Sequence, residues 1–320
     1  MPKGITGAGV ETGWINKWAF QSGAFAADDV GRQAVENGFI TPAMLAYVLG
    51  HTYFVSNLFG ADTNDGLTWA KAFKTITKAL SVAVNYDNII IGLGVYDEGA
   101  ALTITQVGLK LIGVMTSGAM WGQPSIKGLA TTNTLINVKA NSVEIAGIGF
   151  TQNRAAKIIS IAEDAWGVDV WRTHIHHCFF GGNGIATYGV WYGGVGTDAP
   201  FTIIEDCEFY DCLEGIYSNG SSKIQRNLIE VMAAGVGIED IPNGSSRPGC
   251  WILDNRFRSL DAVNGKGIKV TNTPASGQLL IDGNDFAGFA DAAHACDVSG
   301  SGKTGLMGLN YNGITAIPIS

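Results

Sequence analysis

The segment Ile252-Leu253-Asp254-Asn255-Arg256-Phe257 is one copy of a short apolar motif that decides the fold of this chain. The motif reads Ile-x-x-(Asn/Cys/Ile)-x-(Phe/Ile) and occurs six times. Its copies begin at Ile145, Ile175, Ile204, Ile224, Ile252 and Ile281. Since an apolar motif that returns every 20 to 30 residues is typical of a solenoid, we expect stacked coils that complete one another's buried faces.

The spacing within the motif predicts how each coil bends. Its first and middle positions are three residues apart and its last lies two further on, whereas an unbroken strand alternates in steps of two. The extra residue predicts a bend, with Asn227, Asn255 and Asn284 directly after it, because Asn tolerates a left-handed backbone and bonds to nearby backbone. Cys178 and Cys207 share this column as buried thiols, and the spacing leaves a disulfide open.

This repeat resembles that of the pectate-lyase-like right-handed parallel β-helix family, in which a Gly-Ile pair often follows the motif. Four such pairs occur in this chain. They are Gly184-Ile185, Gly215-Ile216, Gly237-Ile238 and Gly267-Ile268. The resemblance covers residues 52–300 and implies an all-β, right-handed parallel β-helix, but it says almost nothing about activity.

The segments outside the repeats predict two domains. Residues 1–50 form a Gly-rich N-terminal arm with short helices, for docking or oligomerisation, and residues 51–320 form the β-helix with a C-terminal tail at 297–320 that covers the last coil. The arm carries aromatic residues suited to docking on another chain. They are Trp14, Trp18, Phe20 and Phe25.

A helix near 69–85 is expected to plug the open end of the stack, since apolar residues recur there at helical spacing. These residues are Phe73, Ile76, Leu80 and Val84. The segment resembles the entry segment of many β-helix proteins. Before it, Asp62, Asn64 and Asp65 favour turn and capping roles over a calcium loop, because the EF-hand pattern is incomplete. An early coil is expected at Leu109, Ile112 and Val114, which repeat the three-then-two step.

Composition narrows the classes of function. The 320 residues include 44 Gly, 15% charged residues and a net charge of −8, without any run of Lys or Arg. This excludes a nucleic-acid surface, and the apolar stretches are too short for membrane insertion. The N-terminal residues lack the apolar core of a signal peptide, which favours assembly in a host cytoplasm.

Stacked coils align equal motif positions about 4.8 Å apart, so the position before the middle residue forms a corner column. This column contains His177, Asp206, Arg226 and Asp254. Because glycosidases use two carboxylates about 5–10 Å apart, Asp206 and Asp254 are candidate catalytic residues, with Glu205 as a third. In a lyase, Arg226 would be the base. The alternating charges also have a structural explanation, since they relieve repulsion between neighbours.

Two further clusters are candidate sites. In the run His174, His176 and His177, only His174 and His176 share a face of the predicted strand, and no third metal ligand is apparent. These histidines therefore favour a supporting role, and we expect no metal and no cofactor. Tyr188, Trp191 and Tyr192 lie among glycines and are expected in an inserted loop, where they would bind a glycan or a partner subunit.

Two classes of function fit the sequence. Residues 25–41 resemble the start of small structural proteins of tailed bacteriophages. This resemblance implies a non-enzymatic virion protein, of the capsid-decoration or tailspike-like type, that forms homotrimers, docks on partners such as the major capsid protein and contacts host-surface polysaccharide. The alternative is a polysaccharide-degrading enzyme, either a lyase or a glycoside hydrolase, because the fold alone does not choose between them.

Overall fold

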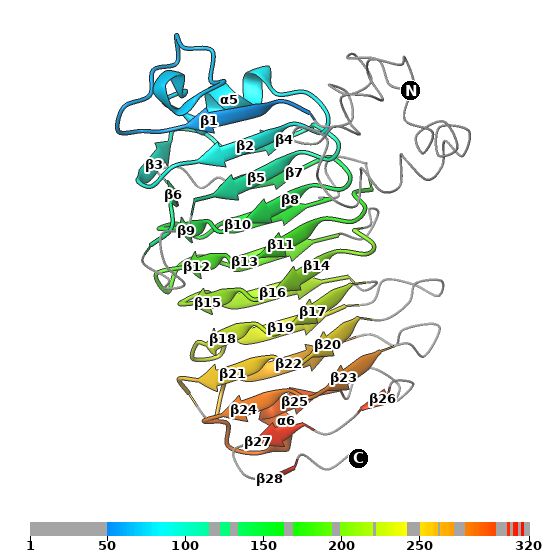
Figure 1. The fold of residues 1–320 in the computed structure, drawn as a ribbon. Helices are drawn as coiled ribbons and strands as arrows, with labels where there is room; N and C mark the ends of the chain where they lie inside the picture. Colours follow the sequence, from blue (N-terminus) through cyan, green and yellow to red (C-terminus); the bar gives the residue numbers. More distant parts are fainter. Residues whose placement is uncertain are drawn as a thin grey trace, which may run out of the picture. The chain divides into compact units, whose positions relative to one another are not determined.

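Three parallel β-sheets run along the described chain, which passes through them in the same order in each coil (Figure 1). The structure is a computed structural model that describes residues 50–114, 122–128, 134–162, 169–193, 199–219, 222–241, 250–261, 263–271, 279–298, 306–307, 310–312 and 315–316. The predicted arm and its aromatic residues Trp14, Trp18, Phe20 and Phe25 lie outside these ranges. The predicted all-β, right-handed parallel β-helix is confirmed.

We name the sheets A, B and C. Sheet A contains β1 (Thr52–Val55), β2 (Asn88–Ile91), β5 (Lys110–Gly113), β8 (Glu144–Ala146), β11 (His174–His176), β14 (Ile203–Glu205), β17 (Lys223–Gln225), β20 (Trp251–Leu253), β23 (Leu280–Asp282) and β26 (Leu306–Met307). Sheet B contains β3 (Val95–Glu98), β6 (Ser125–Gly128), β9 (Gly149–Thr151), β12 (Phe179–Gly181), β15 (Glu208–Tyr210), β18 (Leu228–Val231), β21 (Arg256–Ser259), β24 (Asp285–Ala287), β27 (Tyr311–Asn312) and β28 (Thr315–Ala316). Sheet C contains β4 (Leu102–Ile104), β7 (Ile136–Val138), β10 (Lys157–Ile161), β13 (Tyr188–Tyr192), β16 (Glu214–Ser218), β19 (Val236–Asp240), β22 (Lys266–Val270) and β25 (Cys296–Asp297).

The repeated motif fills the interior as two apolar columns. All six motif isoleucines pair in register along sheet A and are fully buried, from Ile145 to Ile281. The last motif positions pair in the same way along sheet B, from Phe150 to Phe286. The core is therefore a stack of like residues rather than one central cluster.

The bend between sheets A and B depends on the residue before the Asn/Cys column. In all six motif copies this residue has a positive φ, between 53° and 67°. These residues are Gly147, His177, Asp206, Arg226, Asp254 and Gly283. The expectation that the asparagines themselves take up the left-handed conformation was wrong. The asparagine side chains are instead buried and hydrogen-bond along the stack. The preceding residue turns the chain so that these side chains point inward.

The asparagine column forms a continuous ladder. Asn255 Nδ2 donates to the carbonyl of Ile224 and to Oδ1 of Asn284, both at 3.0 Å, and Asn227 repeats the arrangement on Asn255. The ladder continues to Asn310, which belongs to a degenerate seventh copy of the motif that sequence reasoning missed. All five cysteines are free and buried, so Cys178 and Cys207 extend this column as thiols.

Two register predictions were wrong. In sheet C the Gly-Ile column begins with Gly189-Val190, not with Gly184-Ile185, because Gly184 lies in a turn and Ile185 is exposed. In the early coil, Leu111 pairs with Ile145 of the motif column, so the reading that began at Leu109 was shifted by two residues.

The first coil is closed by a helix shorter than predicted. Helix α5 (Ile76–Val82) packs its buried Ile76, Ala79 and Leu80 against the first strands, after a 3-10 turn η2 (Trp69–Lys71). Asp62 accepts hydrogen bonds from the backbone N–H of Lys74 and Thr75, so the chain turns there and the helix begins only afterwards. Asp62 therefore has the expected turn role, whereas Thr75 caps the helix by accepting a hydrogen bond from the backbone N–H of Lys78.

At the other end, helix α6 (Ala292–Ala295) leads into β25, and the tail adds β26 and β27 to sheets A and B. Backbone pairing therefore continues into the predicted tail. Within the residues that the structure describes, no helix is both long and apolar enough to span a bilayer.

Candidate functional site

Two of the three predicted catalytic carboxylates, Asp206 of the corner column and the preceding Glu205, meet one arginine of that column. Arg226 donates from Nε and a terminal nitrogen to the two carboxylate oxygens of Asp206, at 2.9 and 2.7 Å, and also donates to Glu205 Oε2 at 2.8 Å. Asp254 lies in the next coil, and no ion pair joins it to Arg226 among the described residues. The two proposed partners Asp206 and Asp254 thus have different surroundings.

Glu205 is held ionised in this network. Burial would raise the pKa of its carboxyl, but hydrogen bonds from Gln225, His174 and Arg226 outweigh it and lower the pKa to about 2. A general acid needs a pKa near the working pH. The predicted Glu205 is therefore poorly suited to donate a proton, and the corner functions as an ion-pair network on the outside of the stack.

The histidine run joins the same network. His174 Nε2 lies 2.9 Å from Glu205, and His176 Nε2 lies 3.2 Å from Glu144, which also pairs with Lys110 at 2.8 Å. The hydrogen bond to His176 is the largest cause that lowers the pKa of Glu144 to about 2. Among the described residues, no three His, Cys, Asp or Glu side chains are placed to hold a metal ion.

The predicted aromatic cluster lies in strand β13 of sheet C, so the expectation of an inserted loop was wrong. Alternation along the strand turns Tyr192 inward, where it is fully buried and hydrogen-bonds to Ser222, while Tyr188 and Trp191 are partly exposed on the outer face. Burial strongly raises the pKa of Tyr192. Tyr192 therefore belongs to the core, and only Tyr188 and Trp191 can meet a ligand.

Tyr217 of β16 joins these two rings on the outer face of sheet C. The Trp191 and Tyr217 rings stack with centroids 5.6 Å apart and planes 15° apart, and Tyr188 meets Tyr217 edge-on at 5.6 Å. Lys157 Nζ lies 3.6 Å from the centroid of the Trp191 ring. The ring faces are thus largely used within the sheet, so the rings present edges and polar groups to solvent.

Two carboxylates continue this face on the neighbouring strands. Burial and the charge of Glu239 raise the pKa of Glu214 to about 7, although Lys269 opposes the shift. Glu239 is nearly buried and pairs with Lys269 at 2.6 Å. Glu214 is therefore partly protonated near neutral pH, beside the carboxylate of Glu239.

Sequence reasoning missed Tyr217, Glu239 and Lys269, although a signal was present. Each follows directly after a Gly-Ile pair of sheet C, and Trp191 follows Gly189-Val190 in the same register. The residue after the pair points outward in every coil. Aligning that position from coil to coil would have revealed a column of Trp191, Tyr217, Glu239 and Lys269. We call this column, together with Tyr188 and Glu214, the sheet C face.

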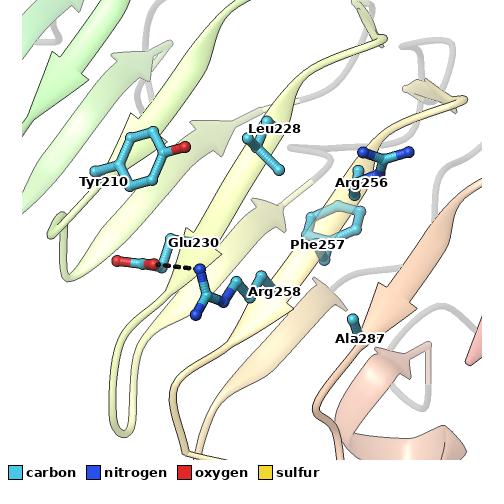
Figure 2. A pocket seen from close by; sticks show the side chains of 7 residues that line it. All are labelled: Tyr210, Leu228, Glu230, Arg256, Phe257, Arg258 and Ala287. Atoms are coloured by element: carbon cyan, nitrogen blue, oxygen red, sulfur yellow. Dashed lines mark ion pairs between the residues drawn. The ribbon is translucent and has the colours of Figure 1, made fainter. Parts of the chain in front are cut away.

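A separate hollow of about 220 Å³ lies on the outside of sheet B (Figure 2). Its lining comes from four consecutive strands. The residues are Tyr210, Leu228, Glu230, Arg256, Phe257, Arg258 and Ala287. Sequence reasoning did not find this hollow, because these outer positions do not repeat from coil to coil.

Comparisons with known proteins place the fold. No family model matches this chain, and no curated protein matches it in sequence. The solved pectin methylesterase of Aspergillus niger superposes with a TM-score of 0.55 at 14% identity, over 82% of this chain and 85% of that one. The rice weevil pectin methyl esterase gives 0.51 at 11% identity, over 87% and 95%.

A protein of Geobacillus virus E2, ORF18, is also similar, with a TM-score of 0.42 at 13% identity over 89% of this chain and 63% of that one. At such low identities the comparisons show the fold alone. This chain shares the parallel β-helix fold of carbohydrate-active enzymes, and a phage protein is among its structural neighbours.

Proposed function

We propose that this protein binds polysaccharide through the sheet C face without cleaving it. The observation that carries the proposal is the grouping of Tyr188, Trp191 and Tyr217 with Glu214 and Glu239 on one face of adjacent strands. Aromatic edges combined with a few well-placed polar groups are typical of ligand sites, and Tyr and Trp suit surfaces that are partly wet.

The fold supports the same class of ligand by analogy. The structures with the same fold include enzymes whose names state that they act on pectin, which is a polysaccharide. A shared fold raises the expectation of a sugar ligand without assigning a reaction. The site must therefore be argued from its own residues.

A second candidate function is hydrolysis of a glycosidic bond, which Glu214 favours. Glycosidases keep one carboxyl protonated near neutral pH as the acid and a second ionised as nucleophile or base. Glu214, with its pKa of about 7, fits the first role. Glu239 fits the second poorly, because it is nearly buried and engaged by Lys269. Because Glu239 is a poor candidate for the nucleophile or base, the sheet C face favours binding over cleavage.

Replacement of Trp191 tests the binding proposal. We expect Trp191→Ala to weaken binding to the polysaccharide that the wild-type protein retains, by tenfold or more, because it removes the centre of the aromatic column. The measurement is depletion of the protein by a panel of immobilised bacterial surface polysaccharides and pectin. Trp251→Ala is the matched control, since Trp251 is 48% exposed on sheet A.

The same panel separates binding from cleavage. If the wild-type protein releases reducing ends and Glu214→Gln abolishes this release, the non-enzymatic reading is wrong. If no polysaccharide of the panel retains the protein, or if both tryptophan variants behave alike, the sheet C face is not the binding surface. Thermal unfolding of each variant checks that the fold is intact.

We also propose that this binding takes place on the virion of a tailed bacteriophage. In this proposal residues 1–50 dock a homotrimer on other virion proteins, such as the major capsid protein, and the β-helix reaches host-surface polysaccharide. The support is the resemblance of residues 25–41 to small phage structural proteins, together with the division of the chain into units at Gly50 and His51.

Removal of residues 1–50 tests the docking proposal. We expect the fragment 51–320 to keep its β-sheet circular dichroism and its melting temperature, because the coil stack is a unit with its own core. It should no longer co-sediment with phage particles, whereas the full chain should. Undiminished attachment of the fragment would contradict the docking role of the arm.

A further inference from the structure

The hollow on sheet B is elongated along the stack. Its lining spans β15, β18, β21 and β24, which is about 14 Å at the usual strand spacing of about 4.8 Å. Leu228, Ala287 and the ring of Tyr210 give it an apolar surface. Its volume of about 220 Å³ is below the roughly 300 Å³ at which pockets for drug-sized ligands begin. The hollow therefore suits one small ring with the rest of a chain outside it.

Two arginines of β21 stand beside this apolar surface, and within the described part of the chain no hydrogen bond uses their guanidinium groups. Figure 2 shows the Arg258 side chain directed toward Glu230 and the Arg256 side chain on the other side of the hollow. The nearest carboxylate oxygens are 3.9 Å from Arg258 and 3.7 Å from Arg256, at Glu230 and Asp285. Both distances exceed the length of a hydrogen bond.

Arg226 of the corner column is held more tightly than these two arginines. The Arg226 side chain donates three hydrogen bonds to Asp206 and Glu205, whereas among the described residues the guanidinium groups of Arg256 and Arg258 donate none. The side chains of Arg256 and Arg258 are 73% and 66% exposed, so a ligand can reach them. Guanidinium groups bind carboxylates through bidentate hydrogen bonds, and the long ion pairs of Arg256 and Arg258 do not have this geometry.

Glu230 is a weak competitor for Arg258. Burial, followed by the charge of Asp211, raises the pKa of Glu230 despite the presence of Arg258. A carboxylate that is costly to ionise in this place gives up its arginine readily to a better-placed anion. The hollow thus combines an apolar surface with two accessible cations.

We propose that this hollow binds an acidic oligosaccharide. The C–H face of one sugar ring lies on Leu228, and the carboxylate of that ring binds Arg256 in the same cross-strand row, while the carboxylate of a neighbouring ring binds Arg258 beside Ala287. A free inorganic anion would bind the two arginines but would not contact the apolar surface. A neutral sugar would pack on the apolar surface but would not pair with the arginines. This site lies on a different sheet from the sheet C face and does not depend on it.

Isothermal titration calorimetry with the full chain tests the proposal. The probes are trisaccharides of galacturonate, glucuronate and mannuronate, with the neutral galactose trisaccharide and sodium sulfate as comparisons. We expect at least one uronate trisaccharide to bind tenfold or more tightly than either comparison. The double variant Arg256→Gln with Arg258→Gln should lose this binding by tenfold or more, and Ala287→Phe, which fills the hollow but keeps both charges, should lose it too.

Matched variants separate the two sites. Arg154→Gln removes another exposed arginine and should leave uronate binding unchanged. The proposal is overturned if no uronate binds, if sulfate or the neutral sugar binds equally well, or if the double arginine variant binds like the wild type. Loss of uronate binding in Trp191→Ala would assign the ligand to the sheet C face instead and would equally overturn it.

Discussion

Replacement of Asn255 by Ala is expected to lower the free energy of unfolding by about 3–5 kcal/mol, because it interrupts the asparagine ladder in the middle. Asn255 is almost fully buried. Its Nδ2 donates to the carbonyl of Ile224 and to Asn284 Oδ1, and its Oδ1 accepts from both the backbone N–H and the side chain of Asn227.

The size of this effect follows from the groups left behind. Alanine leaves the buried backbone N–H of Asn227 without its acceptor, and it removes one hydrogen bond each from Asn227 Nδ2, the carbonyl of Ile224 and Asn284 Oδ1. Each buried polar group left unsatisfied costs about 1–3 kcal/mol. Urea unfolding followed by circular dichroism measures the change. Asn264→Ala, in an exposed turn, is the control and should cost less than about 1 kcal/mol. A loss below 1 kcal/mol for Asn255→Ala would show that the ladder contributes little.

The ladder also shows what could be predicted from sequence. The columns of isoleucine, asparagine and phenylalanine were predictable because a buried residue must match the same residue one coil away, so selection for packing repeats it. Asn310 escaped prediction because its copy of the motif has Met307 and Asn312 at the outer positions. Only the buried hydrogen bond to Asn284 reveals that it belongs to the column.

The outer residues were predicted less well for the opposite reason. Trp191, Tyr217 and Glu239 share a column, but they lie on the outer face of sheet C, outside the stacked core, and no neighbour demands the same residue type there. A glycine-rich sequence around Tyr188 and Trp191 therefore resembled a loop, although Gly189 is required by strand packing. A Cβ there would lie 2.6 Å from the carbonyl oxygen of Gly215 and 2.7 Å from the ring of Phe209.

The phenylalanine column lies against these glycines, and Phe209→Ala is expected to lower the free energy of unfolding by about 3–5 kcal/mol. Phe209 is fully buried, and its ring stacks on Phe180 with centroids 4.5 Å apart and planes 3° apart. On its other side it pairs in register with Ile229. Because every coil is closed by its neighbours above and below, the cavity opens on two coils at once and backbone collapse cannot fill it.

Two matched variants sharpen this prediction. Phe201→Ala removes the same side chain from a position that is 56% exposed, and we expect it to cost less than about 1 kcal/mol. Phe209→Ile places in the column the residue that already stands at Ile229, so the loss should be intermediate, about 1–2 kcal/mol. Chemical unfolding of the three variants gives the order. If Phe209→Ala and Phe201→Ala cost the same, the stacked phenylalanine column is not what holds the coils together.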